Sequence, residues 1–181
     1  MTTTKSRTWP LQEAREVAES LITLLRPACE RIEIAGSVRR QRPQVGDIEL
    51  LAISKTAPAY LQLAPDRPPL EWVHLDARVG ELIARDILSF RLKRNGTRTY
   101  GRLNKLLVHV PSGISVDLFL TTAQYWGMSM VVRTGPREFN IKLFSRLRSL
   151  GLKGHAYGGV EESRGLMFDC PTEETVFGFA H

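Results

Sequence analysis

Apolar residues recur along the chain with two different spacings, which together predict a mixture of helices and strands. A period near 3.6 residues, typical of amphipathic helices, covers residues 10–25, 76–89 and 138–150. Shorter apolar runs predict strands over residues 31–35, 45–53, 106–110 and 114–120. In the last of the helices, the apolar stripe that we expect to face inward consists of Phe139, Leu143, Phe144 and Leu147.

Proline, glycine and short polar residues mark where these elements end. Pro27 ends the first helix, and the turn at residues 111–113 predicts a hairpin between the last two strands. Prolines concentrated in residues 55–71 indicate a surface excursion rather than a linker between domains. Near the end of the chain, Thr172 is placed to cap a short helix whose first turn is acidic.

The most informative stretch joins the first two predicted strands. Gly36 and Ser37 follow the first strand, so the backbone can approach an anion closely, and two arginines come next. On the second strand Asp47 and Glu49 are two residues apart, so both carboxylates point to the same face. Adjacent carboxylates repel each other, and a hard cation such as Mg²⁺ removes that conflict while also binding phosphate oxygens. This combination predicts a site for a nucleoside triphosphate.

A third acid, Asp117, lies between two apolar residues of the last predicted strand. An acid in such a strand is costly unless it is paired or binds a metal. If this strand neighbours the one that carries Asp47 and Glu49, the three carboxylates can share a cation. The alternative for the first two acids is a surface strand with salt bridges to Arg39, Arg40 or Arg42.

The composition is that of an ordinary globular chain with a basic balance. Its 181 residues carry a net charge of +6 and the pI is about 9.7, which favours an anionic partner. Cys29 and Cys170 form no CxxC or Cys/His cluster, which argues against zinc and for a reducing compartment. Residues 1–8 lack an apolar signal-peptide core, and no run reaches membrane-spanning length. We therefore expect a cytoplasmic protein, in a bacterium or a virus-infected cell, that has no membrane partner.

A basic, turn-rich strip begins after the predicted helix over residues 76–89. Within it Asn95-Gly96 predicts a hairpin turn. Two interpretations are open: the strip is either a solvated edge whose charges prevent aggregation, or a rim that contacts phosphates. Its cations are Arg91, Lys93, Arg94, Arg98, Arg102 and Lys105.

Four short motifs follow one another along the chain: Gly-Ser-x-Arg-Arg, Gly-Asp-Ile-Glu, a hairpin-borne Val-Asp-Leu, and Arg-Thr-Gly-x-x-x-Phe-Asn at the start of a helix. This order resembles the nucleotidyltransferase core of the DNA polymerase X family, and is closest to small stand-alone versions in viruses and bacteria. The resemblance covers residues 9–177. It implies an α+β fold with a nucleotidyltransferase palm, which combines a mixed sheet and flanking helices, over residues 1–131. A small C-terminal nucleotide-binding subdomain would follow over residues 132–181.

The resemblance also implies roles for individual residues. Asp47, Glu49 and Asp117 match the carboxylates that are both catalytic and metal-binding. Ser37 and Arg40 match the contacts to the triphosphate. Gly135 and Asn140 match the segment beside the incoming sugar and base, and Gly46 an adjacent backbone contact. The nucleotide-binding set is thus Gly36, Ser37, Arg40, Gly46, Arg133, Gly135 and Asn140. Taken on the residues alone, Ser37 could instead cap a helix, and Asn140 could pair locally.

Several features depart from the family pattern. The second carboxylate is Glu49 where the polymerases have Asp, and this Asp-x-Glu arrangement resembles aminoglycoside nucleotidyltransferases. The aromatic pair that usually precedes Thr-Gly is Val132-Arg133 here. The basic residue that commonly stands two positions before the third acid is replaced by Ser115. No N-terminal lyase domain or helix-hairpin-helix is visible.

The implied activity is that of a gap-filling, repair-type DNA polymerase. Such an enzyme adds a nucleotide from a deoxynucleoside triphosphate to a primer 3′-hydroxyl, by a mechanism with two Mg²⁺ ions or with Mn²⁺. The expected partners are primer-template or gapped DNA and a nucleoside triphosphate, with the chain as a monomer. Two other functions are open: transfer of a nucleotide to a small molecule or a protein hydroxyl, and a non-catalytic nucleic-acid-binding module.

Overall fold

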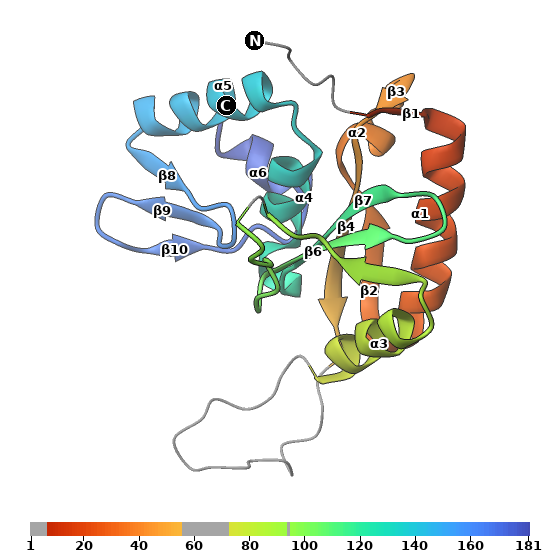
Figure 1. Cartoon of the computed structure of the whole chain (residues 1–181). Coiled ribbons are helices and arrows are strands. Elements are labelled where there is room, and N and C mark those ends of the chain that lie inside the picture. Colours follow the sequence, from red (N-terminus) through yellow and green to blue (C-terminus); the bar gives the residue numbers. More distant parts are fainter. Residues whose placement is uncertain (1–6, 56–72, 94) are drawn as a thin grey trace, which may run out of the picture.

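The structure is a computed structural model and describes residues 7–55, 73–93 and 95–181. Within this part of the chain, the centre is a five-stranded sheet of order β2-β4-β7-β6-β5 (Figure 1). Strands β4 and β7 run parallel, whereas the other neighbours are antiparallel. The prediction of an α+β fold with a mixed sheet is therefore confirmed. The strands are β2 (Cys29–Ile34), β4 (Asp47–Ser54), β5 (Leu88–Phe90), β6 (Asn104–His109) and β7 (Ile114–Leu120).

Helices and smaller strands surround this sheet (Figure 1). The helices are α1 (Leu11–Leu25), α2 (Gly36–Arg39), α3 (Val73–Ala84), α4 (Trp126–Thr134), α5 (Arg137–Ser149) and α6 (Glu173–Gly178), with 3-10 turns at Arg26–Ala28 and Ala123–Tyr125. A two-stranded ribbon pairs β1 (Trp9–Pro10) with β3 (Gln44–Val45). A second antiparallel sheet contains β8 (Leu152–Gly154), β9 (Val160–Glu162) and β10 (Met167–Phe168). In the described residues, no helix is long and apolar enough to cross a membrane.

The two faces of the central sheet carry different partners because alternate strand residues point to opposite sides. Ile48 and Val116 belong to the larger apolar core, which they share with α1 and α3. Leu51 and Phe119 belong to a smaller cluster with Trp126 and Met130 of α4. The three candidate acids have the same odd-numbered parity as Leu51 and Phe119. They therefore lie on the face of the sheet that α4 covers.

The C-terminal part packs around its own apolar cluster, which joins α4, α5 and α6 to the smaller sheet. Thr172 caps α6, as predicted, because its side chain accepts a hydrogen bond from the backbone N–H of Thr175 at 3.2 Å. Arg39 of α2 ties the central sheet to α6 through a two-pronged ion pair with Glu173, at 2.8 and 2.6 Å. The predicted boundary between the palm and the C-terminal subdomain, at residues 131 and 132, falls inside α4 and stays a prediction.

The helix predicted over residues 76–89 is wrong at both ends. Helix α3 starts earlier, at Val73, and ends at Ala84, while Ser89 lies in strand β5. Asp86 adopts a left-handed backbone with φ of 54°, which stops the helix. Leu88 then pairs with His109 of β6. Pairing with a neighbouring strand thus overrides the helical spacing of the apolar residues, which a local pattern does not reveal.

Phe139 was expected to face inward, and this is wrong. Its side chain is 40% exposed and lies outside the buried cluster. Its ring packs edge to face against the ring of Phe177, with 6.1 Å between the two ring centres. Helix α5 buries Leu143 and Leu147 instead, with Phe144 packed partly against them. The stripe that the helix actually buries is therefore narrower than the sequence pattern suggested. The excursion predicted over residues 55–71 lies outside the described residues, apart from Lys55.

Lys105 is neither a solvated charge nor a phosphate contact of the basic strip, because it is only 1% exposed. Its ammonium lies 2.8 Å from the Asp76 carboxylate of α3 and donates to the carbonyl of Gly101 at 2.9 Å. It also lies 4.5 Å from the centre of the Tyr100 ring, while the Tyr100 hydroxyl donates to Asp76 at 3.1 Å. These contacts form a structural network that fastens α3 to the edge of the sheet.

We expect an Asp76→Asn substitution to lower the free energy of unfolding by about 2 kcal/mol, because it leaves the Lys105 ammonium buried without an anion. Urea unfolding measures this loss. The double variant Asp76→Asn, Lys105→Met removes the stranded charge, so it should be more stable than Asp76→Asn alone. Equal stability of the single and double variants would contradict the view that the ammonium is costly to bury without its anion.

Candidate active site

The three predicted carboxylates meet where β4 and β7 run side by side. In this parallel pair Glu49 stands directly opposite Asp117, and Asp47 stands opposite Ser115. Residues opposite each other in a sheet point to the same face, so Glu49 and Asp117 are neighbours and Asp47 lies two positions along the same row. The condition for the three acids to share one site, namely that the strand of Asp117 adjoins the strand of the other two, is therefore met. In the described residues, no ion pair joins Asp47 or Glu49 to Arg39, Arg40 or Arg42.

Burial makes these carboxyl groups poor anions without a cation. It is the largest cause that raises the pKa of Asp47, Glu49 and Asp117 above their usual values. Burial, followed by repulsion from the two aspartates, raises the pKa of Glu49 to about 7. Three arginines oppose these shifts: Arg40 and Arg91 act on Asp47, while Arg91 and Arg133 act on Asp117. The site is therefore a negative cluster within a positive surround.

Metal-free protein should be less stable at pH 8 than at pH 5, in part because of Glu49. Its carboxyl group has a pKa of about 7 in the folded protein against an ordinary value of 4.5, so the folded state retains a proton that the unfolded state has released. The free energy of unfolding therefore falls as the pH rises from 5 to 8, by about 2 kcal/mol after allowance for the partial exposure of Glu49. Urea unfolding in EDTA measures the fall, which Glu49→Gln should reduce. An unchanged pH dependence in Glu49→Gln would contradict this assignment.

The turn between β2 and β4 brings a glycine against one of the acids. Gly36 has φ of 63°, a backbone that favours glycine, and a Cβ added there would overlap the Glu49 carboxylate. The backbone N–H of Ala35 donates to the carbonyl of Glu49 at 2.8 Å, which holds the two strands in this position. Close approach of α2 to Glu49 is thus possible only because residue 36 has no side chain.

Ser37 does not cap α2, so that alternative is wrong. The residue at the N-cap is Ala35, and no side chain caps the helix. The Ser37 hydroxyl oxygen is buried and has no hydrogen-bond partner in the structure. An unpaired buried hydroxyl is costly, which favours the interpretation that it binds a ligand. Gly46 is exposed immediately before Asp47, with open space around its Cα.

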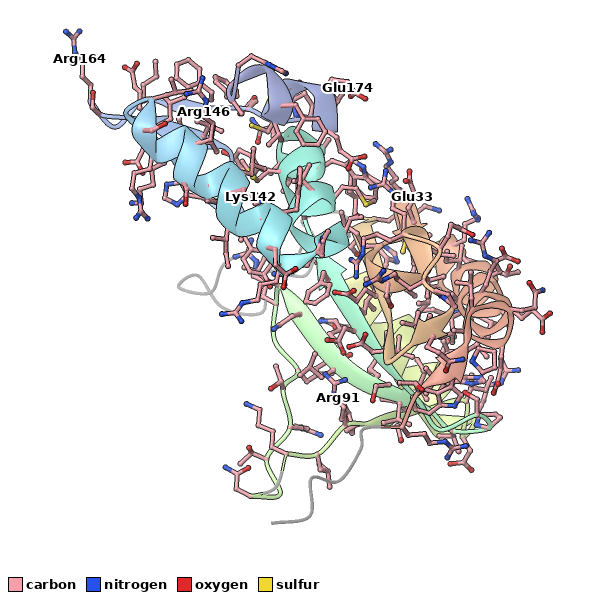
Figure 2. All side chains as sticks on the ribbon, turned by 90° about the horizontal axis from the view of Figure 1, so that it is seen from above. Glu33, Arg91, Lys142, Arg146, Arg164 and Glu174 are labelled. Atoms are coloured by element: carbon pink, nitrogen blue, oxygen red, sulfur yellow. The ribbon has the colours of Figure 1, made fainter. Side chains whose placement is uncertain are left out.

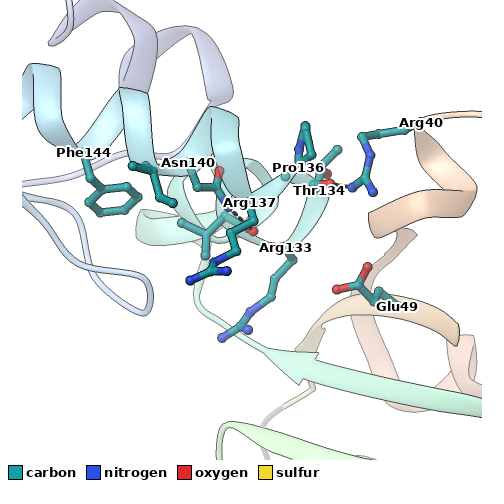
Figure 3. Close-up of a pocket in the computed structure, with 11 residues that line it drawn as sticks. Arg40, Glu49, Arg133, Thr134, Pro136, Arg137, Asn140 and Phe144 are labelled. Carbon is teal, nitrogen blue, oxygen red and sulfur yellow. Dashed lines mark hydrogen bonds between the residues drawn. The ribbon is translucent and has the colours of Figure 1, made fainter. Parts of the chain in front are cut away.

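A cavity of about 480 Å³ opens beside Glu49 (Figure 3). Arg40 and Glu49 stand at one end of it, the segment from Val132 to Pro136 forms the middle, and Asn140 and Phe144 of α5 stand at the other end (Figure 3). Of the predicted nucleotide-binding residues, the structure brings five to this cavity or its acid: Arg40, Arg133, Gly135 and Asn140 line it, and Gly36 contacts Glu49. Lining residues that the sequence did not single out include Thr134, Arg137 and Ile141.

Two of the cavity residues hold the chain around Gly135 in place. Arg40 donates to the backbone carbonyl of Thr134, and the Asn140 amide donates to the carbonyl of Val132 at 2.8 Å. Gly135 itself has φ of 63° and ends α4. The local pairing considered for Asn140 therefore exists, but it uses only the amide nitrogen. Its Oδ1 is buried without a partner, so it is free to accept a hydrogen bond from a ligand.

Arg133 lies between two aromatic rings on the wall of the cavity. Its guanidinium lies 3.8 Å from the centre of the Phe119 ring and 4.7 Å from that of Tyr157. Contacts with two aromatic faces hold a cation beside the acids without neutralising it. The Nε atom is buried without a partner. Arg133 therefore contributes positive charge to the wall of the cavity, close to the carboxylates.

Arg91 is a further residue that the sequence did not assign to this site, and it is the one that lies against Asp117. Its Nη2 lies 2.7 Å from Oδ1 of Asp117, and the guanidinium partly offsets the rise that burial causes in the pKa of that carboxyl group. As the side chains stand, no group of three or more Asp, Glu, His or Cys residues in the described ranges is arranged to hold a metal ion. The chemistry of the donors nevertheless suits Mg²⁺, because three carboxylates on one face of the sheet offer the oxygen ligands that this ion prefers.

A scan against protein-family models and a search of curated proteins return no match for this chain. The functional interpretation therefore depends on the residues described above and on how the fold arranges them.

Proposed function

We propose that this chain is a metal-dependent nucleotidyltransferase that adds a nucleotide from a deoxynucleoside triphosphate to the 3′-hydroxyl of a primer in gapped or primed DNA. The observation that supports this proposal most is the pairing of Glu49 with Asp117 on adjacent parallel strands, next to an arginine-lined cavity. Acids alone would suit many metal sites. Acids beside a cavity large enough for a small ligand and rich in arginine suit a substrate that carries phosphates.

The side chains divide the proposed work between them. Asp47, Glu49 and Asp117 would hold Mg²⁺, which when bound supplies positive charge to the attacking hydroxyl and to the leaving pyrophosphate. Arg40, which lies at the same end of the cavity as Glu49, would pair with triphosphate oxygens. The buried Ser37 hydroxyl offers a further hydrogen bond near the start of α2. The segment from Val132 to Pro136 and the face of α5 then leave room for the nucleoside.

Primer extension tests the proposal directly. The chain is incubated with a labelled primer on gapped DNA, a deoxynucleoside triphosphate and Mg²⁺ or Mn²⁺. We expect products longer by one nucleotide, and none when EDTA replaces the metal. Absence of extension on gapped, primed and single-stranded DNA with either metal would reject the proposed function.

The same experiment without nucleic acid tests transfer to a small molecule or a protein. The Asp-x-Glu pair motivates this second candidate, but Arg40, Arg133 and Arg137 line the cavity and disfavour a cationic acceptor. Label transferred from a nucleoside triphosphate to a protein or small molecule, with no extended primer, would favour it. Salt-sensitive DNA binding without any transfer would favour a non-catalytic module.

A further inference from the structure

Arg91 comes from the edge of the central sheet, after strand β5, and its side chain extends toward the acids. It follows β5, and its backbone N–H donates to the carbonyl of Leu106 in β6 at 3.0 Å. Leu106 stands opposite Asp117, which in turn stands opposite Glu49. Arg91, Leu106, Asp117 and Glu49 therefore form one row across four chain segments, and the Arg91 side chain spans one strand to approach Asp117.

The ion pair between Arg91 and Asp117 occupies the position that a metal cation would take at this carboxylate. Nη2 of Arg91 lies 2.7 Å from Oδ1 of Asp117, and the two side chains are 28% and 15% exposed. The guanidinium supplies the positive charge that a metal cation at Asp117 would otherwise supply. A cation and Arg91 therefore compete for the same carboxylate.

Arg91 also begins an exposed basic segment. Lys93 and Arg98 are exposed, and the Arg98 guanidinium lies 4.4 Å from the centre of the Phe90 ring, directed away from the acids toward β5. The segment turns at Gly96, whose N–H donates to the carbonyl of Lys93 at 2.9 Å, and it extends away from the sheet beyond Arg91 (Figure 2). Arginines and lysines on one projecting segment suit a chain of phosphodiesters.

We propose that Arg91 couples the binding of a phosphodiester strand to the binding of a metal cation at Asp117. Without a strand, the guanidinium pairs with Asp117. A phosphate of a strand bound along residues 91–93 and 95–98 attracts the guanidinium and releases Asp117 to the cation. This inference rests on the proposed function, which requires both ligands at one site.

Thermodynamic linkage gives the coupling a measurable form. The factor by which the strand raises the affinity for the cation equals the factor by which the cation raises the affinity for the strand. We expect a factor of about three to ten, which lies around the lower end of the usual range of coupling between two sites. Coupling of this kind would favour assembly of the complete site only when an acceptor strand is present.

The experiment measures Mn²⁺ affinity from the electron paramagnetic resonance signal of free Mn²⁺, at constant ionic strength. The strand is a single-stranded oligodeoxynucleotide at saturating concentration, with a dideoxy 3′ end so that no transfer can occur. In the unsubstituted chain we expect the oligonucleotide to tighten Mn²⁺ binding about three- to tenfold. Arg91→Gln should bind Mn²⁺ more tightly than the unsubstituted chain without oligonucleotide, and the oligonucleotide should then add nothing.

Arg148→Gln is the matched control, because it removes an exposed positive charge in the last turn of α5, outside both the strand-binding segment and the lining of the cavity. At saturating oligonucleotide it should retain the coupling. The inference fails if the unsubstituted chain shows no coupling, if coupling persists in Arg91→Gln, or if Arg148→Gln abolishes it equally. Because no transfer occurs in this assay, primer extension without coupling would refute the inference alone, whereas coupling without primer extension would refute the proposed function alone.

Discussion

Asp117→Asn is expected to lower the rate of primer extension at least about 10³-fold, because the amide removes a charged oxygen from the group that would hold the metal. The expected loss is one of chemistry and not of folding. The pKa of Asp117 is raised mainly by burial, so a neutral amide of the same shape is less costly to bury than the carboxylate. The free energy of unfolding in EDTA should therefore stay the same or rise. Single-turnover extension of a gapped substrate and urea unfolding measure the two quantities separately.

Asp86→Asn is the matched control for this substitution. Asp86 is exposed at the turn after α3, and its φ of 54° is a backbone conformation that asparagine also tolerates. It makes the same chemical change far along the chain from the acid row, so it should extend primers at the unsubstituted rate. If Asp117→Asn extended primers as fast as Asp86→Asn does, Asp117 would have no part in the reaction.

The acid row was largely predictable because most of it depends on local spacing. A period of two places Asp47 and Glu49 on one face, and the turn at residues 111–113 predicts the hairpin that carries Asp117. Only one long-range assumption was needed, namely that the two strands adjoin. The structure bears that assumption out. Sequence patterns of this kind are reliable where each residue's role follows from its immediate neighbours.

The residues that lie around the acids were not predictable in the same way. The approach of Arg91 to Asp117 depends on the order of β5, β6 and β7 and on their register, which no local pattern encodes. Lys105 looked like its basic neighbours, yet α3 supplies Asp76 to it from an earlier part of the chain. Phe139 had the right helical spacing for the core but lies beyond the buried stripe. In each case, the partner comes from a distant segment.

Gly36→Ala is expected to lower the rate of primer extension about 10²-fold and the free energy of unfolding by about 2 kcal/mol. Two effects act together. A left-handed φ of 63° is strained for alanine, and the new methyl group would occupy the position of the Glu49 carboxylate. The end of the Glu49 side chain is the part best able to move, so the chain should still fold. Glu49 would then be displaced from Asp117, its neighbour across the sheet.

Gly80→Ala is the control for Gly36→Ala, because it shows what replacing a glycine by alanine does elsewhere in the chain. Gly80 lies on the exposed side of α3, with open space around its Cα, so alanine should leave extension unchanged and stabilise the helix by up to about 1 kcal/mol. Mn²⁺ titration of both variants then tests the cause of the loss. Gly36→Ala should bind Mn²⁺ more weakly than Gly80→Ala, because Glu49 no longer points at the shared site. Equal Mn²⁺ affinity together with slow extension would place the defect in the phosphate contacts of α2, and would contradict the view that residue 36 serves chiefly to leave room for Glu49.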